Sequence, residues 1–542
     1  MKTSTDLLKL FPEPHGIPEE YRLAAPLRQR VYLVGGELLQ WDGDCQTVLS
    51  PVCTRSADGR IAQVEIGSYP LHDGAASDAA LDAAVAAYDK GRGEWPTLSV
   101  GQRIACIEDF TRKMVALRGQ IVQLIMWEIG KSLADSEKEF DRTVEYIKAT
   151  INALKELDNG NSRFMVVEGT IGQVRRTPLG VVLCMGPYNY PLNETFATLI
   201  PALIMGNTLV FKPPKYGALL FYPLLEAFRS ALPKGVINTV YGPGATIVPR
   251  MLNSGKIDVL TLIGSSKVAN HLKKEHPKAH RLRAILGLDA KNAAIVLPDA
   301  DIELAVKECL LGALSFNGQR CTALKMLIVH QSIVKPFLQR FVEELDKLKV
   351  GMPWEKGVQI TPLPELAKTD YLTDCIRDAE EKGARVVNEG GGTVCGTLFY
   401  PAVVYPVREG MKLYREEQFG PVVPVMAFDD VDTALDYVAT SEHGQQVSIF
   451  GKDPDRIGAL VDPLVNQVCR VNINCQCQRG PDVFPFAGRK DSAEGTLSVS
   501  DALRAFSIRS MVAAKQTEHS KQLLDAIVLG NKSNFINTRF IL

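Results

Sequence analysis

The stretch Leu179-Gly180-Val181-Val182-Leu183-Cys184-Met185-Gly186-Pro187-Tyr188-Asn189-Tyr190-Pro191 decides the fold of this 542-residue chain. Its first part is an apolar run without polar alternation, which is typical of a strand buried on both faces of a parallel sheet. The glycine and prolines that follow predict a loop where the strand ends. Ligands bind at this edge of parallel sheets, so the stretch predicts a strand and a site together.

Strands and helices alternate on the carboxyl side of this stretch, which predicts a doubly wound parallel sheet. The first series has helices at 194–205 and 219–232 and strands at 208–211, 236–241 and 259–263. A second series begins near Asn292, with strands at 293–297 and 325–329, a helix starting at Asp299 or Asp301 and ending at 316, and a helix at 333–348. We therefore expect two α/β units.

Composition narrows the class of protein. The 61 basic and 62 acidic residues offer no surface of one sign, which argues against a nucleic-acid or membrane partner. The charged, proline-containing start does not resemble a signal peptide, and prolines interrupt the least charged segment, 178–211. Eleven irregularly spaced cysteines fit reduced thiols, and Cys475-Gln476-Cys477 lacks a second zinc knuckle. We expect a soluble cytoplasmic protein without a metal.

The candidate nucleophile is Cys321, in the segment Ser315-Phe316-Asn317-Gly318-Gln319-Arg320-Cys321-Thr322-Ala323. A loop between a helix and a strand suits a presented thiol, and the adjacent Arg320 would favour its thiolate form. A free cysteine taken alone is more often a buried structural residue. The neighbouring motifs decide between these interpretations.

Three further motifs follow the 179–191 stretch, and two of them end strands. They are Phe211-Lys212-Pro213-Pro214-Lys215, Leu262-Ile263-Gly264-Ser265-Ser266 and Glu416-Glu417-Gln418-Phe419-Gly420-Pro421-Val422. In this order and spacing, from about residue 67 to 512, the chain resembles the aldehyde dehydrogenase superfamily. The sequence motifs are most similar to those of the non-phosphorylating, NADP-dependent glyceraldehyde-3-phosphate dehydrogenases. They include Gln478-Arg479-Gly480 followed by Phe484-Pro485-Phe486.

The resemblance implies an aldehyde dehydrogenase-like α/β fold, with two doubly wound domains and a small oligomerisation hairpin around 157–174. The cofactor-binding domain would comprise 1–154 and 177–288, the catalytic domain 289–490, and the oligomerisation and bridging region 155–176 and 491–542. We expect a homodimer or homotetramer. The polar tail after 516 would either fray or dock on a neighbouring subunit.

The family mechanism gives Cys321 and Asn189 their expected roles. The thiolate of Cys321 would attack the aldehyde, and the side-chain amide of Asn189 with the backbone N–H of Cys321 would stabilise the oxyanion. Hydride would leave for the nicotinamide, and a thioester would remain on Cys321.

The resemblance also implies a cofactor site. Lys212 and Lys215 would approach the adenosine ribose, Ser265 the pyrophosphate, and Glu417 with Phe419 the nicotinamide ribose. Many NAD-preferring relatives have a glutamate in place of Lys215, which would repel a 2′-phosphate. A lysine reverses that sign, so we expect NADP rather than NAD.

By the same resemblance, the substrate is a small phosphorylated aldehyde, most simply glyceraldehyde 3-phosphate oxidised to 3-phosphoglycerate. Its phosphate would be held by Arg142, Tyr190, Arg320 and Arg479. Three arginines converging on one small site would be costly without an anion, which favours a phosphorylated substrate.

The chain departs from the family at the general base for thioester hydrolysis. In Leu286-Gly287-Leu288-Asp289-Ala290-Lys291-Asn292, Gly287 takes the place of the usual glutamate. Asp289 is a substitute only if the backbone moves, because it begins ~6.6 Å farther along an extended segment. We rank hydrolysis, through Asp289 or an unassigned base such as Glu416 or Glu417, above transfer of the acyl group to coenzyme A or phosphate. A non-catalytic NADP-binding protein ranks third.

Overall fold

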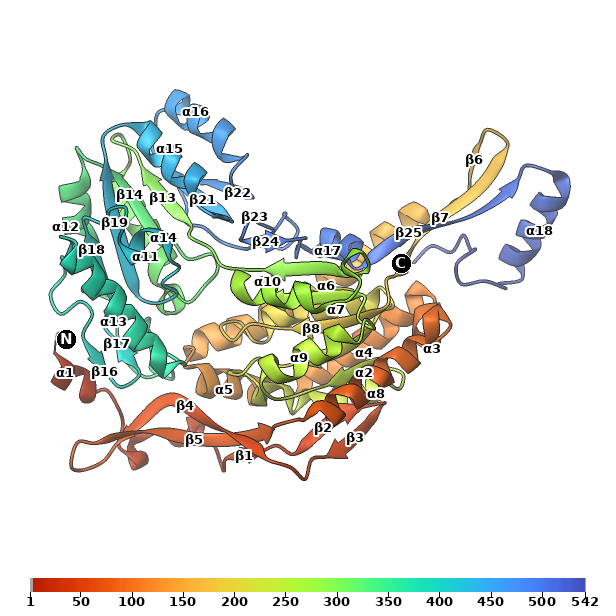
Figure 1. The fold of residues 1–542 in the computed structure, drawn as a ribbon, viewed down its shortest axis with the longest axis horizontal. Helices are drawn as coiled ribbons and strands as arrows, with labels where there is room; N and C mark the ends of the chain where they lie inside the picture. The colour runs from red at the N-terminus through yellow and green to blue at the C-terminus, as the bar shows by residue number, and fades with distance from the viewer. Residues whose placement is uncertain (1–2, 542) are drawn as a thin grey trace.

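The computed structural model describes residues 3–541, and its main body consists of two α/β units (Figure 1). The first unit is built on a six-stranded sheet in which β8 (Val181–Met185), from the opening stretch, pairs in parallel with two neighbours. The strand order is β10 (Ile237–Thr239), β9 (Thr208–Lys212), β8, β11 (Val259–Ile263), β12 (Arg283–Gly287) and β24 (Ala493–Glu494). β24 runs antiparallel to β12, whereas the other neighbouring pairs of this sheet are parallel.

Helices cover both faces of this sheet, which explains the unbroken apolar strands. Alternate residues of β8 show the arrangement, because Leu183 joins one buried cluster and Val182 another. The Leu183 cluster includes α2 (Gly74–Tyr88), α9 (Gly244–Asn253) and α10 (Ser266–Glu275). The Val182 cluster includes α4 (Val100–Ala116), α6 (Leu133–Asn161), α7 (Asn193–Ile204) and α8 (Leu224–Ala231).

The second unit is built on a seven-stranded sheet with β14 (Met326–His330) at its centre. The order is β15 (Arg385–Val386), β18 (Ala402–Tyr405), β19 (Val422–Phe428), β14, β13 (Ala293–Val296), β21 (Gln446–Phe450) and β22 (Arg470–Ile473). Apolar residues of α11 (Ile302–Leu314) and α12 (Val334–Leu345) pack in one cluster. Those of α13 (Leu366–Glu381), α15 (Val431–Thr440) and α16 (Pro454–Leu464) pack in another. The predicted α/β class is confirmed.

Two predicted helices differ from the observed ones. The helix expected at 219–232 is a short 3-10 turn, η4 (Leu219–Phe221), followed by α8. Pro223 stands between them and has no N–H to continue the helical bonding. The helix expected to end at 316 ends at Leu314, because Phe316 and Asn317 adopt left-handed φ values of 48° and 56°.

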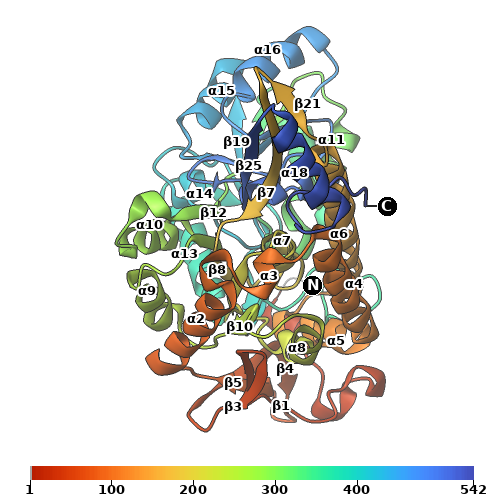
Figure 2. The same ribbon diagram turned by 90° about the vertical axis from the view of Figure 1, so that its right-hand side faces the viewer.

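A hairpin arm projects from the body (Figures 1 and 2). It consists of β6 (Met165–Val167), β7 (Thr170–Pro178) and β25 (Ser507–Lys515), and α18 (Glu518–Leu529) follows at its end. The end of the tail is held on its own chain and is not frayed, whereas docking of the tail on a neighbouring subunit stays a prediction. The backbone of Ile541 donates to Asn159 Oδ1 at 2.8 Å and accepts from Asn159 Nδ2 at 2.9 Å.

Within residues 3–541, none of the helices has the length and apolar character needed to cross a membrane. The same residues contain no cluster of three or more His, Cys, Asp or Glu side chains suited to a metal ion.

Candidate active site

The candidate site lies where the two sheets face each other. Asn189 follows the carboxyl end of β8, whereas Asn292, Lys325 and Gln445 directly precede β13, β14 and β21. The carboxyl edge of the first sheet therefore supplies one side of the site and the amino edge of the second sheet supplies the other. Cys321 is in the loop between α11 and β14.

The loop that carries Cys321 is held in an unusual backbone conformation. Phe316, Asn317 and Gly318 all have positive φ, and the Asn317 side chain accepts from Thr361 N at 2.9 Å and donates to Thr361 Oγ1 at 3.2 Å. Non-glycine residues in this region are uncommon and cluster at functional sites. The backbone carbonyl of Cys321 accepts from Asn292 Nδ2 at 2.8 Å and from Lys325 Nζ at 3.1 Å.

Three charges act on the Cys321 thiol, which is partly exposed. Burial raises the pKa of this thiol, Lys325 lowers it, and Glu417 raises it; Arg320 has a smaller lowering effect. The sequence analysis predicts that Arg320 favours the thiolate. In the structure the principal cation at the thiol is Lys325, four residues beyond Cys321.

Asn189 is brought to the Cys321 loop as expected. Its side chain is buried, and Nδ2 donates to the backbone carbonyl of Gln319 at 2.8 Å, two residues before Cys321. An amide has two N–H donors, so this bond orients Asn189 and leaves the second donor for an oxyanion.

A buried ion pair between Lys131 and Glu139 holds the turn that carries Asn189. Lys131 Nζ donates to Glu139 Oε2 at 2.5 Å and to the carbonyl of Asn189 at 2.7 Å, with both charged side chains fully buried. Glu139 Oε1 accepts from the backbone N–H of Leu192 and Asn193 at 3.0 and 3.2 Å. The pair thus fixes both ends of the turn that presents Asn189.

Two lysines hold the segment 416–419, which contains the expected nicotinamide-ribose residues Glu417 and Phe419. Lys325 pairs with Glu417 at 2.5 Å and lies 5.5 Å from the ring centroid of Phe419, which has a φ of 46°. Lys291 Nζ donates to the carbonyl of Glu416 and to Gln418 Oε1, both at 2.7 Å. Burial lowers the pKa of Lys291 to about 7.

The expected adenosine-side residues lie at the carboxyl edge of the first sheet. Lys212 ends β9, and burial lowers its pKa to about 8, while Lys215 is exposed. Ser265 caps α10, and its side chain accepts from Val268 N. A helix N-terminus and two lysines are a suitable donor set for a phosphorylated dinucleotide.

Asp289 lies beside this helix N-terminus. Its Oδ2 accepts from the backbone N–H of Ser266 at 2.7 Å and from the Ser266 hydroxyl at 2.8 Å. The carboxylate therefore competes for donors beside the expected pyrophosphate site. The carboxylate that acts most strongly on the Cys321 thiol is that of Glu417.

Gly287 is the last residue of β12, and its backbone does not require a glycine. A Cβ built there meets Ile263 and Leu497 side-chain atoms at 3.5 Å, an ordinary contact. Gly287 and Gln445 line one small cavity together with Phe486, Ser492 and Leu497. A longer side chain at 287 is therefore absent for a reason other than backbone strain.

The three expected substrate arginines are in different environments. Buried Arg479 pairs with Glu194 and with Asp482 at 3.2 Å, and Arg142 pairs with the same Asp482 at 2.8 Å. Arg320 Nη2 donates to the carbonyl of Gly312 at 3.0 Å and to Gln476 Oε1 at 3.2 Å. Glu194 and Asp482 supply anions for two arginines, so the argument that uncompensated charge requires an anionic substrate applies to Arg320.

The fourth expected substrate residue, Tyr190, stacks over the Lys131 ammonium, which is 3.5 Å from its ring centroid. Burial raises the pKa of the Tyr190 hydroxyl, and the charges of Arg320 and Arg142 lower it. Both arginines therefore act electrostatically on Tyr190.

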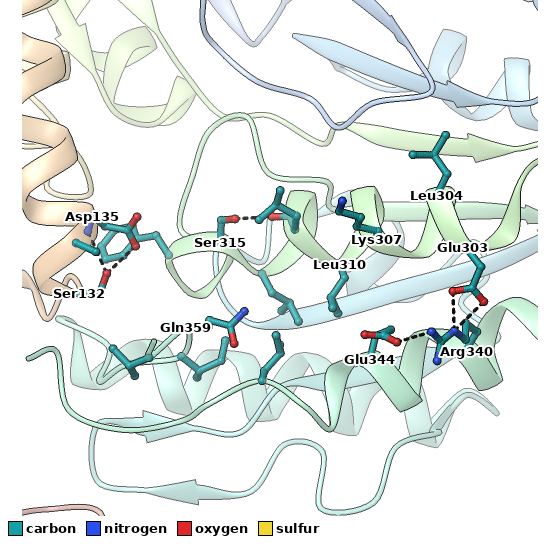
Figure 3. Close-up of a pocket in the computed structure, with 17 residues that line it drawn as sticks. Ser132, Asp135, Glu303, Leu304, Lys307, Leu310, Ser315, Arg340, Glu344 and Gln359 are labelled. Atoms are coloured by element: carbon teal, nitrogen blue, oxygen red, sulfur yellow. Dashed lines mark hydrogen bonds and ion pairs between the residues drawn. The ribbon is translucent and has the colours of Figure 1, made fainter. Parts of the chain in front are cut away.

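A cavity of about 710 Å³ is lined by residues other than Cys321 and the four expected substrate residues (Figure 3). Ser132 and Asp135 line it from the start of α6, Lys307 from α11 and Arg340 from α12. Phe316 also lines this cavity, but Cys321 does not. It is thus separate from the thiol.

Several residues of the cluster were missed by sequence reasoning. Lys131, Glu139 and Glu194 are charged residues that become buried only through contacts between distant segments. Lys325 had a detectable signal, because it lies four residues after Cys321 in the same loop. Asp482 and Gln445 gave none.

Two α/β units place a cysteine loop at the site between their sheets, and a hairpin arm projects from the body. The sequence model of the aldehyde dehydrogenase family matches residues 59–512, so the protein is an oxidoreductase that acts on aldehydes. The chain belongs to the aldehyde dehydrogenase family.

Individual relatives agree with this placement. An NADP-dependent glyceraldehyde-3-phosphate dehydrogenase of Streptococcus equinus is 34% identical over 458 residues, 84% of this chain and 93% of the relative. A 3-sulfolactaldehyde dehydrogenase of Priestia aryabhattai is 28% identical over 74% of this chain and 83% of its own. The crystal structure of the NADP-dependent glyceraldehyde-3-phosphate dehydrogenase of Bacillus halodurans, complexed with NADP, superposes with a TM-score of 0.82 at 30% identity, covering 92% of this chain and all of that one.

Proposed function

We propose that the protein oxidises glyceraldehyde 3-phosphate with NADP through a thioester on Cys321. One observation carries the proposal: the Asn189 amide is anchored two residues from Cys321, and a second N–H remains for an oxyanion. The relatives named for this reaction support the substrate, as do the positive charges of Arg142 and Arg320 that act on Tyr190.

In this mechanism the Cys321 thiolate adds to the aldehyde carbon, and Asn189 stabilises the oxygen that gains the electron pair. NADP, when bound, accepts hydride from that carbon. Lys212, Lys215 and Ser265 would hold the nucleotide, and Glu417 with Phe419 would hold its nicotinamide end. The Asp289 carboxylate, which accepts from Ser266 at this helix N-terminus, would repel a phosphate bound beside it.

We further propose that the six-stranded unit binds the cofactor, the seven-stranded unit carries catalysis, and the arm joins subunits. For thioester hydrolysis, Glu417 is a better candidate base than Asp289, because its charge acts on the Cys321 thiol. To accept a proton it must first leave its ion pair with Lys325, as Asp289 would have to leave Ser266. Glu416 is engaged elsewhere, since its side chain accepts from the Tyr371 hydroxyl at 3.0 Å.

A second candidate function is acyl transfer, and Gly287 favours it because no carboxylate stands at the expected base position. The acceptor would be coenzyme A or phosphate. Hydrolysis ranks first because Glu417 remains near the thiol.

Pre-steady-state formation of NADPH from glyceraldehyde 3-phosphate tests these functions. Continued turnover in plain buffer supports hydrolysis, and a one-equivalent burst rescued by coenzyme A or phosphate supports transfer. Tight NADP binding without a burst would refute both. Glu417→Gln should slow steady turnover and spare the burst size, whereas Asp289→Asn should leave steady turnover unchanged if Glu417 is the base.

A further inference from the structure

Another cavity lies where the arm joins the body, and its lining residues are not those of the candidate active site. Its volume is about 440 Å³, which is within the usual range of small-molecule sites. The strand β7, which runs from the arm into the body (Figure 1), contributes Arg175 and Arg176. α4 contributes Arg103, α6 contributes Asp158, and the tail contributes residues 533–535.

Positive charge dominates the lining of this cavity. Arg175 pairs with Asp158 at 2.6 Å, and both side chains are largely buried. Arg103 and Arg176 make no ion pair with a carboxylate of residues 3–541, and both donate to backbone carbonyls instead. Three guanidinium groups and one carboxylate therefore leave an excess of two positive charges in the lining.

Each of the three guanidinium groups also keeps a nitrogen that donates to no acceptor in the described chain. These nitrogens are Nη2 of Arg103, Nε of Arg175 and Nη1 of Arg176. Nε of Arg175 is buried, in a side chain that is only 5% exposed. A buried N–H without an acceptor costs free energy, so this donor calls for one.

The surroundings of Arg176 add further positive charge. Burial lowers the pKa of Arg176, and so do the like charges of Arg504, Arg509 and Arg283. Of these three, Arg504 pairs with Asp501 at 3.7 Å, and the other two make no ion pair in the described chain. An anion bound beside Arg176 would relieve this repulsion.

We propose that the cavity binds a small phosphate monoester, with Arg103, Arg175 and Arg176 facing its phosphate and the tail forming one wall. Guanidinium groups bind phosphate oxygens through paired N–H donors and keep their charge at neutral pH. A phosphate monoester carries nearly two negative charges at this pH, which matches the excess in the lining. Leu98 and Phe535 also line the cavity and would contact the organic part. The inference does not depend on the proposed function.

Hydrogen–deuterium exchange followed by mass spectrometry tests the site, because it reports on the tail and on the Cys321 loop in separate peptides. The probes are glycerol 2-phosphate and inorganic phosphate, each titrated against sodium chloride at equal ionic strength without cofactor or aldehyde. We expect glycerol 2-phosphate to slow the exchange of residues 533–541 saturably, with a Kd no weaker than that of inorganic phosphate. Tail exchange that follows ionic strength alone would overturn the proposal, and so would tighter binding of inorganic phosphate.

Arg176→Gln removes one guanidinium group at a partly exposed position. It should weaken the binding of glycerol 2-phosphate at the tail about tenfold or more, because a hydrogen bond to a charged group is lost. Arg320→Gln is the matched control, because Arg320 belongs to the proposed substrate site and does not line this cavity. Tail protection lost in Arg320→Gln and retained in Arg176→Gln would place the anion at the active site and overturn the proposal.

Ser533→Asp and Ser533→Asn test the same site if Arg176→Gln fails to fold. Ser533 Oγ accepts from the backbone N–H groups of Phe535 and Ile536 at 3.1 and 2.9 Å, and aspartate or asparagine can accept the same bonds. The aspartate adds a carboxylate to the wall of the cavity and should weaken the binding of glycerol 2-phosphate, whereas the asparagine of equal size should not. Equal binding by the two variants would contradict the proposal.

Discussion

At the scale of single residues, the thiol of Cys321 is governed by opposing charges. Burial and Glu417 raise its pKa, while Lys325 lowers it. The nucleophile is the deprotonated form, which increases as pH rises through the pKa. The rate of the NADPH burst should therefore increase from neutral into alkaline pH.

Glu417→Gln should move this profile to lower pH by about half a unit, because it removes a negative charge near the thiolate and frees Lys325 from its ion pair. Iodoacetamide alkylation of the Cys321 peptide measures the change. Glu416→Gln is the control, since that carboxylate accepts a hydrogen bond from the Tyr371 hydroxyl at 3.0 Å, whereas Glu417 pairs with Lys325. An unchanged or higher midpoint in Glu417→Gln would show that another charge dominates.

Gly287→Glu should restore a base where the family has one. Gly287 lines a small cavity together with Gln445, and a Cβ at 287 makes only ordinary contacts. We expect steady formation of acid to accelerate about tenfold or more, with the burst size unchanged. Gly287→Gln has the same length without a base, and equal rates in the two variants would mean that hydrolysis does not limit turnover.

Residues differ in how far the sequence could predict them. Asn189 and the Cys321 loop lie inside recognisable sequence motifs, and the structure brings them together. Gln445 and Asp482 make contacts across 153 and 340 residues of chain, with Asn292 and Arg142 respectively, so no local pattern predicts them.

At the scale of elements, the periodicity located most strands well because their apolar runs are short and bounded by turns. β11 spans Val259–Ile263, the range expected from the sequence. The helix at 219–232 was overestimated, since the apolar pattern continues through Pro223 while the backbone hydrogen bonding does not. The left-handed residues 316 and 317 depend on Thr361, which a local pattern cannot include.

The Lys131–Glu139 pair couples the start of α6 to the Asn189 turn, and Lys131→Met tests this coupling. Removing the lysine leaves Glu139 charged and buried, which should cost about 3–5 kcal/mol of the free energy of unfolding. Urea denaturation measures the loss. The double variant Lys131→Met/Glu139→Leu should recover part of it, and a single variant as stable as wild type would show that the pair does not support the turn.

At the scale of the whole molecule, the projecting arm carries exposed apolar side chains. Exposed apolar patches on a protein surface typically mark interaction sites. Val166 is 55% exposed, Val167 62%, Met511 55% and Leu529 81%. We expect self-association through the arm, with a solution mass that is a multiple of 59.4 kDa.

Val167→Asp with Met511→Asp should reduce that mass, measured by light scattering, to a single chain. Val465→Asp is the control, because it places the same charge on an exposed valine of the seven-stranded unit, away from the arm. A wild-type protein that already runs as one 59.4 kDa chain would contradict the role given to the arm.

The central claim is that Cys321 carries the acyl group during aldehyde oxidation. The most direct measurement is the mass of the protein quenched in acid during reaction with NADP and glyceraldehyde 3-phosphate, followed by mapping of the adduct. We predict one phosphoglyceroyl group per chain on the Cys321 peptide, sensitive to hydroxylamine and absent from Cys321→Ala. NADPH formation that continues in Cys321→Ala, or in the wild type with the adduct on another residue, would contradict the account.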